Sequence, residues 1–291
     1  MAIVKIKPFE YFQPANLREL LRLLEKYGRE GKIVAGGTDL IPQLKGREVP
    51  APKYVFDIEN LAELNFIGEK DGAIRIGPVV KHSVLQTAAL VKKKIPILAE
   101  AVGHLATPQI RNVGTIGGNL CNASPCADTA PPLMVLGAGL KILSPAGERI
   151  IPVEKFFSFA KITLLDRKEV LAEIIVDPQP AGYGGAFMKV GRRAGHDMAV
   201  ASGATLLKLQ AGRVADVRIA LGSVAPTTIR APKTENYLTG RKYNEKNVMQ
   251  AAEIAAAEIK PISDVRASAE YRRHAVRAII EMTLQRAAGA A

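Results

Sequence analysis

The chain has 291 residues, 48% of them hydrophobic and 23% charged, a composition typical of folded globular proteins that excludes a disordered chain. This length is more than one hydrophobic core usually serves, so we expect two or three structural units. The 40 Lys and Arg residues against 28 Asp and Glu give a formal charge of +12, a field that attracts nucleic acid, acidic membranes or acidic proteins without choosing among them.

The N-terminal segment reads as the start of a β–α–β unit. Residues 9–13 are expected to form a loop that enters a helix, because four leucines recur at helical spacing over 17–24 and Gly28 can end it. A strand is expected at 33–35 and another at 54–58.

Shorter elements follow. The Asp-Gly pair within 70–72 predicts a tight hairpin. Apolar spacing then predicts two short helices over 82–93 and 97–105. A buried helix is expected over 131–137, since its two leading prolines suit a first helical turn.

The second half of the chain changes character at a linker. A hairpin across 144–147 and a strand at 170–176 precede residues 177–182, in which three of six residues are Pro or Gly. The remainder predicts an α+β module, with strands first and helices after. Its expected strands are 186–190, 199–209 and 214–221, and its expected helices are 245–259 and 268–287.

Several features bear on location and on basic-surface partners. Only two cysteines are present and residues 1–5 show no charged-then-apolar leader, so a cytoplasmic protein is expected. The longest apolar run, at 133–143, is interrupted by glycines and a lysine, so no membrane span is expected.

The densest basic run, 92–94, lacks interleaved aromatic residues and reads as a solvated face. With no Trp and no nucleic-acid motif, a nucleic-acid-binding module is disfavoured.

Two glycine pairs carry the functional signal. AGGTDL at 35–40 follows an apolar run, and TIGGN at 115–119 repeats the pair. Glycine-rich turns expose backbone N–H groups in nests that bind phosphate, and two such turns can clamp the two halves of a diphosphate. Each pair alone is more often a plain tight turn, but both run into polar residues, Thr-Asp or Asn, that could bond ribose or phosphate oxygens. Neither a G-x-G-x-x-G opening a helix nor a P-loop occurs, so Rossmann and P-loop folds are disfavoured.

The sequence resembles a known family at three places in the right order: AGGTDL, TIGGNLCNASPCADTAPPL at 115–133 and FMKVGRRAGHD at 187–197. These motifs resemble the FAD-binding medium subunit of the molybdenum hydroxylases, the group of xanthine dehydrogenase and CO dehydrogenase. The resemblance covers essentially the whole chain. It implies an α+β protein with a two-subdomain FAD-binding fold of the vanillyl-alcohol oxidase type, followed by a C-terminal α+β domain like that of the CO dehydrogenase flavoprotein. The FAD-binding domain is expected at 1–178, with subdomains of about 1–60 and 61–178, and the C-terminal domain at 183–291.

The resemblance also implies which residues contact FAD. They are Ala35, Gly36, Gly37, Thr38, Asp39, Leu40, Thr115, Ile116, Gly117, Gly118, Asn119, Asn122, Asp128 and Lys189. The first loop is expected to wrap the diphosphate, Asn122 and Asp128 to reach ribose or adenine-side hydroxyls, and Lys189 to lie near the flavin ring. Asp39 and Asp128 are equally suited to cap the helices that follow them. His196 and Asp197 read either as a pair or as plain surface residues.

The two cysteines do not predict a metal site. Cys121 and Cys126 supply half of a four-cysteine set, and the four histidines are scattered. Because free cysteine is usually buried, we expect structural thiols.

The function that the resemblance implies is that of the flavoprotein subunit of a heteromeric molybdenum hydroxylase. A molybdopterin-containing large subunit would oxidise the substrate, a small [2Fe–2S] subunit would pass electrons on, and FAD in this chain would deliver them to NAD⁺ or another acceptor. No catalytic side chain is expected, because the chemistry belongs to the cofactor. The alternatives are a self-contained FAD-dependent oxidoreductase of the same fold, such as a reductase of UDP-sugar enolpyruvyl ethers, and the nucleic-acid-binding module.

Overall fold

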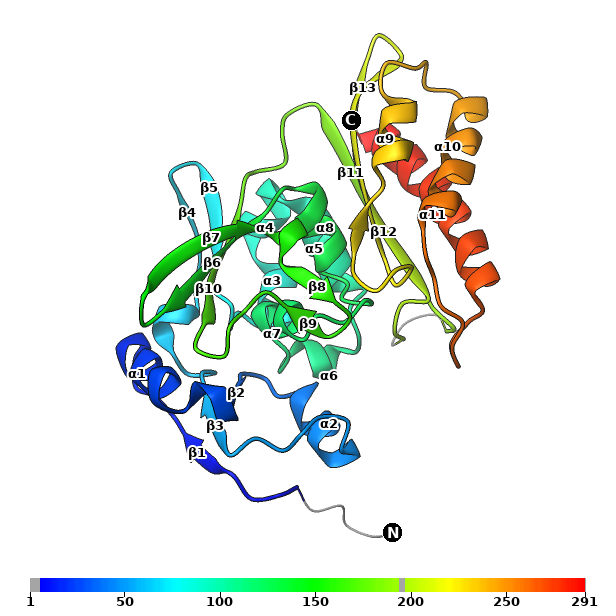
Figure 1. Ribbon diagram of the computed structural model, residues 1–291. Helices are drawn as coiled ribbons and strands as arrows, with labels where there is room; N and C mark the ends of the chain where they lie inside the picture. Colours follow the sequence, from blue (N-terminus) through cyan, green and yellow to red (C-terminus); the bar gives the residue numbers. More distant parts are fainter. Residues whose placement is uncertain (1–5, 194–196, 291) are drawn as a thin grey trace.

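The computed structural model describes residues 6–193 and 197–290 (Figure 1). The strands are β1 Glu10–Phe12, β2 Gly31–Val34, β3 Tyr54–Asp57, β4 Ile67–Lys70, β5 Ala73–Ile76, β6 Gly139–Ser144, β7 Gly147–Pro152, β8 Phe157–Phe159, β9 Ile162–Thr163, β10 Val170–Val176, β11 Tyr183–Val190, β12 Ala201–Gln210, β13 Arg213–Gly222 and β14 Ile229–Arg230. The α-helices are α1 Leu17–Tyr27, α2 Leu40–Gly46, α3 His82–Thr87, α4 Ala89–Lys94, α5 Pro96–Gly103, α6 Pro108–Arg111, α7 Ile116–Cys121, α8 Ala130–Val135, α9 Pro232–Leu238, α10 Glu245–Glu258 and α11 Ala269–Ala290.

The N-terminal sheet has the strand order β1-β3-β2, with parallel pairs. Helix α1 begins where the side chain of Asn16 accepts a backbone N–H bond, and its residues Leu20 and Leu24 pack against Phe56 of β3. The expected loop at 9–13 is wrong, because β1 pairs along its whole length with β3. Three residues are too few for an alternating pattern to appear in the sequence.

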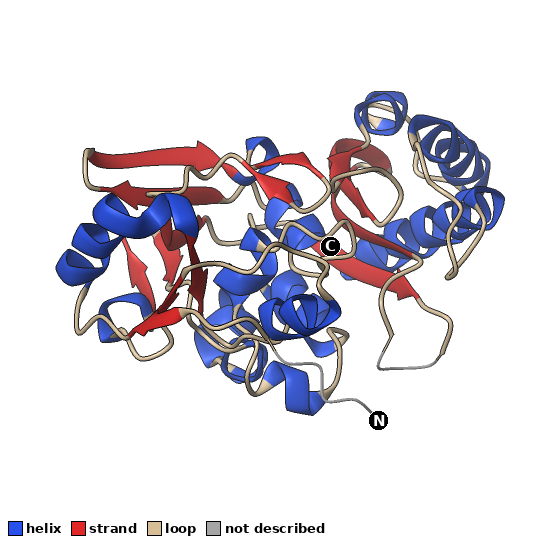
Figure 2. Ribbon diagram, turned by 60° about the horizontal axis from the view of Figure 1, so that its bottom comes forward, coloured by secondary structure: helices blue, strands red, loops and turns tan. Residues whose placement is uncertain are grey.

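The middle of the chain forms a five-stranded antiparallel sheet of order β4-β5-β10-β6-β7, with α3 to α8 beside it (Figure 2). The hairpin predicted at 70–72 is confirmed, and Asp71 and Gly72 have the positive φ angles of 54° and 78° that such a two-residue turn needs. Residues 82–105 form three helices instead of two, because the backbone leaves the helical conformation at Ala88, between α3 and α4.

The C-terminal sheet has the order β11-β12-β13-β14 and is covered on both faces. Helix α11 packs along β11 and β12 on one face, while α5 packs on β11 and α8 on β12 and β13 from the other side (Figures 1 and 2). Phe187 and Leu206 of this sheet belong to the same buried core as α5 and α8. The C-terminal strands are therefore held directly against the middle of the chain.

Some elements of the second half were not expected from the sequence, namely α9, the short pair β8 and β9, and β14. The strands and helices that were expected there lie within two or three residues of their predicted ends. Within the described ranges, none of the helices has the length and apolar character that a bilayer crossing requires.

Candidate cofactor site

The first glycine pair lies in the loop that joins β2 to α2. Gly37 has a φ of 66°, a left-handed conformation that glycine adopts without strain. A Cβ atom on Gly36 would lie only 2.0 Å from the carbonyl oxygen of Val113, so this position accepts no side chain. Within the described residues, the backbone N–H groups from Gly36 to Asp39 donate to no protein acceptor. They are available to an anionic ligand.

The second glycine pair is not the turn with bare N–H groups that the sequence suggested. Gly117 and Gly118 form the first turn of α7, where Thr115 is the N-cap. The N–H of Gly117 donates to the oxygen of Pro78 at 2.8 Å, and that of Gly118 to Oγ1 of Thr115 at 3.1 Å. Because a threonine two residues before the pair caps a helix, the glycines continue into helical structure.

Close packing explains the first of these two glycines. A Cβ atom on Gly117 would lie 2.4 Å from Cβ of Pro78, so the segment before α3 and the start of α7 touch there. Ile116, next to it, is fully buried, and Asn119 accepts a hydrogen bond from the Thr129 hydroxyl at 2.6 Å. These contacts fix the path of the chain from 115 to 129.

The structure brings the first loop against the second segment. Gly36 touches Val113, and Thr38 Oγ1 and a ring carbon of His82 both lie 3.3 Å from the point where Gly114 would carry a Cβ atom. Further along, Nε2 of Gln43 in α2 donates to Oδ1 of Asn122, at the end of α7, over 3.0 Å. Residues 36–43 therefore run beside residues 113–122.

Asp39 does not form the side-chain cap that was one expectation for it. It occupies the N-cap position of α2, which begins at Leu40, but its side chain makes no capping bond and is exposed to solvent. Ala35, at the end of β2, is partly buried against the N-terminal core.

Asp128 and Lys189 form a buried ion pair that joins the two halves of the chain. Their Oδ2 and Nζ atoms are 2.7 Å apart, and Asp128 is only 4% exposed. Nζ of Lys189 also donates to the carbonyl oxygen of His104 at 3.0 Å. Burial raises the pKa of Asp128 to about 6, although the ammonium group of Lys189 acts in the opposite direction.

The same carboxylate has an oxygen to spare. Oδ1 of Asp128 is buried and, among the described residues, meets no hydrogen-bond partner. Asp128 does not cap α8, whose N-cap is Thr129. A buried acceptor without a partner costs free energy, and a ligand hydroxyl at this position would remove that cost.

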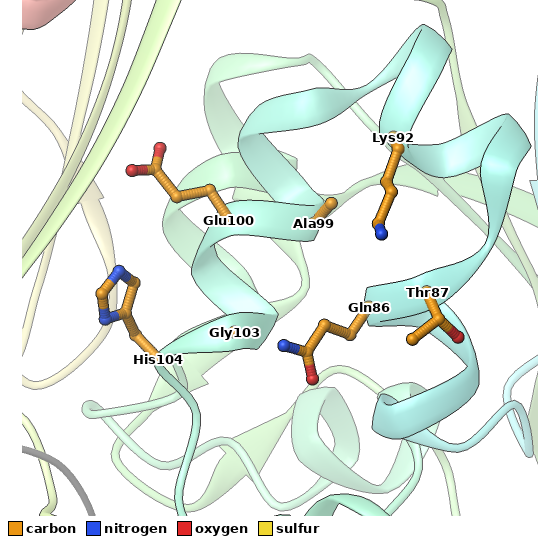
Figure 3. A pocket seen from close by; sticks show the side chains of 7 residues that line it. All are labelled: Gln86, Thr87, Lys92, Ala99, Glu100, Gly103 and His104. Atoms are coloured by element: carbon orange, nitrogen blue, oxygen red, sulfur yellow. The ribbon is translucent and has the colours of Figure 1, made fainter.

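Two histidines near the site were missed by sequence reasoning. His82 is 2% exposed, and burial, helped by the charge of Arg111, lowers its pKa to about 4. His104 lines a cavity of about 440 Å³ between α3, α4 and α5, together with Glu100 and other residues (Figure 3). Figure 3 shows Glu100 and His104 projecting to the same side of α5. An isolated histidine carries no spacing signal, so nothing in the sequence marked either one.

The cysteines and the third motif complete the expected residues. Cys121 and Cys126 are free thiols and partly buried, and burial raises the pKa of Cys121 to about 12. Over the residues that the structure describes, no three His, Cys, Asp or Glu side chains are arranged to hold a metal ion. Asp197 accepts the backbone N–H of Arg192 at 2.9 Å, whereas His196 lies outside the described residues.

Comparisons with known proteins agree over nearly the whole chain. Residues 7–180 match the family described as the FAD binding domain in molybdopterin dehydrogenase, and residues 186–287 match the CO dehydrogenase flavoprotein C-terminal domain. The chain is 34% identical over 264 residues to the carbon monoxide dehydrogenase medium chain of Hydrogenophaga pseudoflava, covering 91% of each protein. It is 32% identical over 283 residues to the xanthine dehydrogenase FAD-binding subunit of Escherichia coli O157:H7, covering 97% of this chain and 96% of the relative.

Solved structures give the same result. A carbon monoxide dehydrogenase structure from Hydrogenophaga pseudoflava has a chain that matches with a TM-score of 0.94 at 34% identity, covering 98% of this chain and 99% of the other. Quinoline 2-oxidoreductase from Pseudomonas putida 86 matches with a TM-score of 0.92 at 33% identity, covering 98% and 99%. The expected α+β fold, with an FAD-binding domain and a CO dehydrogenase flavoprotein-like C-terminal domain, is confirmed. The chain belongs to the FAD-binding medium subunits of the molybdenum hydroxylases, the family of the carbon monoxide and xanthine dehydrogenase flavoproteins.

Proposed function

We propose that FAD is held between the loop at 36–39 and the segment at 113–128, with the Asp128–Lys189 pair at one end. The observation that carries this proposal is that these separate segments run side by side and leave unused hydrogen-bonding groups. The free N–H groups of 36–39 suit a diphosphate, and the unpartnered oxygen of Asp128 suits a ribose or ribityl hydroxyl.

The remaining expected contacts receive more specific roles in this proposal. Thr38 donates its hydroxyl to the diphosphate, and Asn119 and Asn122 contact the cofactor from α7 and its C-terminal end. Gly117 acts by close packing against Pro78, and Gly118 by its bond to Oγ1 of the Thr115 cap, since the N–H groups of both glycines are already bonded. The ammonium group of Lys189 is fixed by Asp128 and by the His104 carbonyl, and it supplies positive charge beside the flavin ring.

We further propose that the chain works with a molybdopterin-containing large subunit and a small [2Fe–2S] subunit, and that NAD⁺ or another acceptor receives the electrons. Bound FAD accepts electrons from one side and passes them to the other. Support comes from the relatives, which include medium chains of carbon monoxide and glyceraldehyde dehydrogenases. Their substrates differ, so we place the choice of substrate in another subunit. The domain limits of 1–178 and 183–291 and the cytoplasmic location remain predictions.

The first test is the visible spectrum of the purified chain, followed by denaturation and chromatography of the released cofactor. FAD in a ratio near one per chain is the expected result. A colourless chain that also takes up no added FAD would contradict the proposed site. Binding of duplex DNA by such a chain at low salt would favour the nucleic-acid alternative.

The second test concerns the acceptor and uses the FAD-loaded chain alone, without oxygen. If NAD⁺ is the acceptor, added NADH should bleach the flavin absorbance by running the last step in reverse. Bleaching by dithionite but not by NADH would rule out NAD⁺ and leave another acceptor. Full turnover of an enolpyruvyl substrate by the isolated chain would instead support the self-contained oxidoreductase.

A further inference from the structure

The side-chain amide of Asn122 is held from two sides. Asn122 directly follows α7, and its Oδ1 atom accepts hydrogen bonds from Nε2 of Gln43 in α2 at 3.0 Å and from Nζ of Lys161 at 3.2 Å. Lys161 lies in the turn between β8 and β9, so the two donors come from segments far apart in the sequence. An amide oxygen has two lone pairs, and both are used here.

Lys161 decides which way this amide points. The two ends of an asparagine amide have nearly the same shape, but the oxygen accepts hydrogen bonds and the NH2 group donates them. An ammonium group can only donate, so its contact with Asn122 requires the oxygen to face it. The Nδ2 atom of Asn122 is therefore turned away from Lys161. In the part of the chain that the structure describes, this NH2 group makes no hydrogen bond of its own.

The turn that carries Lys161 is fixed against the same segment. The backbone N–H of Lys161 donates to the carbonyl oxygen of Ala123 at 2.8 Å, and its φ of 63° is a left-handed conformation that few residues other than glycine adopt. The base of the hairpin is closed by a bond of 2.9 Å from the N–H of Leu164 to the carbonyl oxygen of Phe156, whose side chain is fully buried. The backbone thus places the ammonium group of Lys161 beside Asn122.

The orientation of Asn122 limits what its side chain can bind. Asn122 was expected to reach ribose or adenine-side hydroxyls, and an asparagine amide can in general accept from a hydroxyl or donate to it. With Oδ1 occupied by Gln43 and Lys161, only the donating end remains for a ligand. The group that it meets must therefore supply an acceptor atom.

We propose that Lys161 and Gln43 are positioning residues of the cofactor site. They hold the Asn122 amide so that its NH2 group is directed to FAD, and Asn122 contributes to FAD affinity as a hydrogen-bond donor. This inference rests on the proposed function, because it takes the place of FAD from it.

The test replaces Lys161 by methionine in the full chain and titrates the FAD-free protein with FAD at high salt, following flavin fluorescence. High salt screens the general effect of a lost positive charge. Lys155→Met is the matched control, because Lys155 is also exposed and lies shortly before β8. We expect Lys161→Met to bind FAD at least about fivefold more weakly, the size typical of one lost hydrogen bond. Lys155→Met and Lys161→Arg, which keeps a donor, should bind like the wild type.

Two further variants separate positioning from simple stabilisation. Asn122→Asp keeps acceptors for Gln43 and Lys161 but has no NH2 group. It should unfold at the same or a higher urea concentration than the wild type and still lose FAD affinity at least about tenfold. When Asn122→Ala is already present, adding Lys161→Met should cause no additional loss of FAD affinity, because Lys161 acts through Asn122.

The outcomes distinguish this inference from the function it rests on. A wild-type chain that takes up no FAD contradicts the proposed site as a whole. If the wild type binds FAD and Lys161→Met binds within twofold of Lys155→Met, Lys161 does not position the site. Wild-type FAD affinity in Asn122→Asp would show that Asn122 accepts from a hydroxyl. A further loss on adding Lys161→Met to Asn122→Ala would show that Lys161 acts on FAD directly, and either of these two results overturns the inference.

Discussion

Gly36 offers the sharpest test of how the two cofactor-binding segments are held together. An alanine there would place its Cβ atom 2.0 Å from the Val113 oxygen and 3.1 Å from the Cα atom of Gly114. Real Cβ atoms almost never approach closer than 3.0 Å, so the segments must separate by about 1 Å, the difference between these values. Both neighbours are backbone atoms, and no flexible side chain can move aside.

The expected effect of Gly36→Ala has two parts. Overpacking of this kind typically lowers the free energy of unfolding by about 1–3 kcal/mol. A shift of about 1 Å also moves the open N–H groups of 36–39 away from the segment at 113–128, so one FAD molecule no longer reaches the groups proposed for it in both segments. We expect FAD affinity to fall at least about tenfold, which corresponds to about 1.4 kcal/mol.

The assay is a titration of the FAD-free chain with FAD, followed by flavin fluorescence, together with urea unfolding of the FAD-free chain. Gly68→Ala in β4 is the control, because a Cβ atom there meets nothing within 4 Å. This variant should keep wild-type FAD affinity. If Gly36→Ala binds FAD within twofold of Gly68→Ala and unfolds at the same urea concentration, the close approach of the two segments does not govern cofactor binding.

Three other predictions follow from the site. Lys189→Met should lower the free energy of unfolding by about 3–5 kcal/mol, because it leaves a buried carboxylate unpaired, and adding Asp128→Asn should restore part of the loss in urea unfolding. Because the pKa of His82 is about 4 in the folded chain and 6.5 in an unfolded one, the contribution of this group to stability should fall as pH drops from 6.5 to 4, while Asp128, whose pKa is raised to about 6, contributes in the opposite direction. The loss from His82 approaches about 3 kcal/mol, so the free energy of unfolding of His82→Gln should rise relative to that of the wild type as the pH is lowered over this range; an unchanged difference would mean that His82 does not titrate in this way. Replacing Cys121 and Cys126 by serine should leave a pure flavin spectrum, whereas loss of a broad band would reveal an iron–sulfur cluster.

Local signals predicted the fold best where they were strong. The leucine spacing and the Asn16 cap define α1, and the Asp-Gly pair defines the β4–β5 hairpin. The second glycine pair was misread because glycine pairs usually mark turns, while the Thr115 cap and the Pro78 contact depend on tertiary structure. Short elements such as β1 have too few residues to show a period.

The candidate site was predicted as a set of residues and not as an arrangement. Its motifs named both glycine segments, Asp128 and Lys189, but the ion pair joins residues 61 positions apart, and no spacing rule reports such a contact. The burial of His82 and the bond from Lys189 to the His104 carbonyl could not be predicted either, since burial and backbone direction are properties of the folded chain. The family match confirms that the cofactor is FAD, whereas the individual contacts to it remain proposals.

The packing of α11 bears on the order of events during synthesis. Arg286 of this helix donates to the carbonyl oxygen of Phe187 and pairs with Glu100 of α5, and Glu100 in turn accepts the N–H of Phe187. The strand that carries Lys189 is thus clamped by a helix made after every other element described. A nascent chain can fold its first segments early, yet it cannot fix this lysine until α11 has left the ribosome. At the site proposed above, capture of the flavin would therefore wait for the translation of α11.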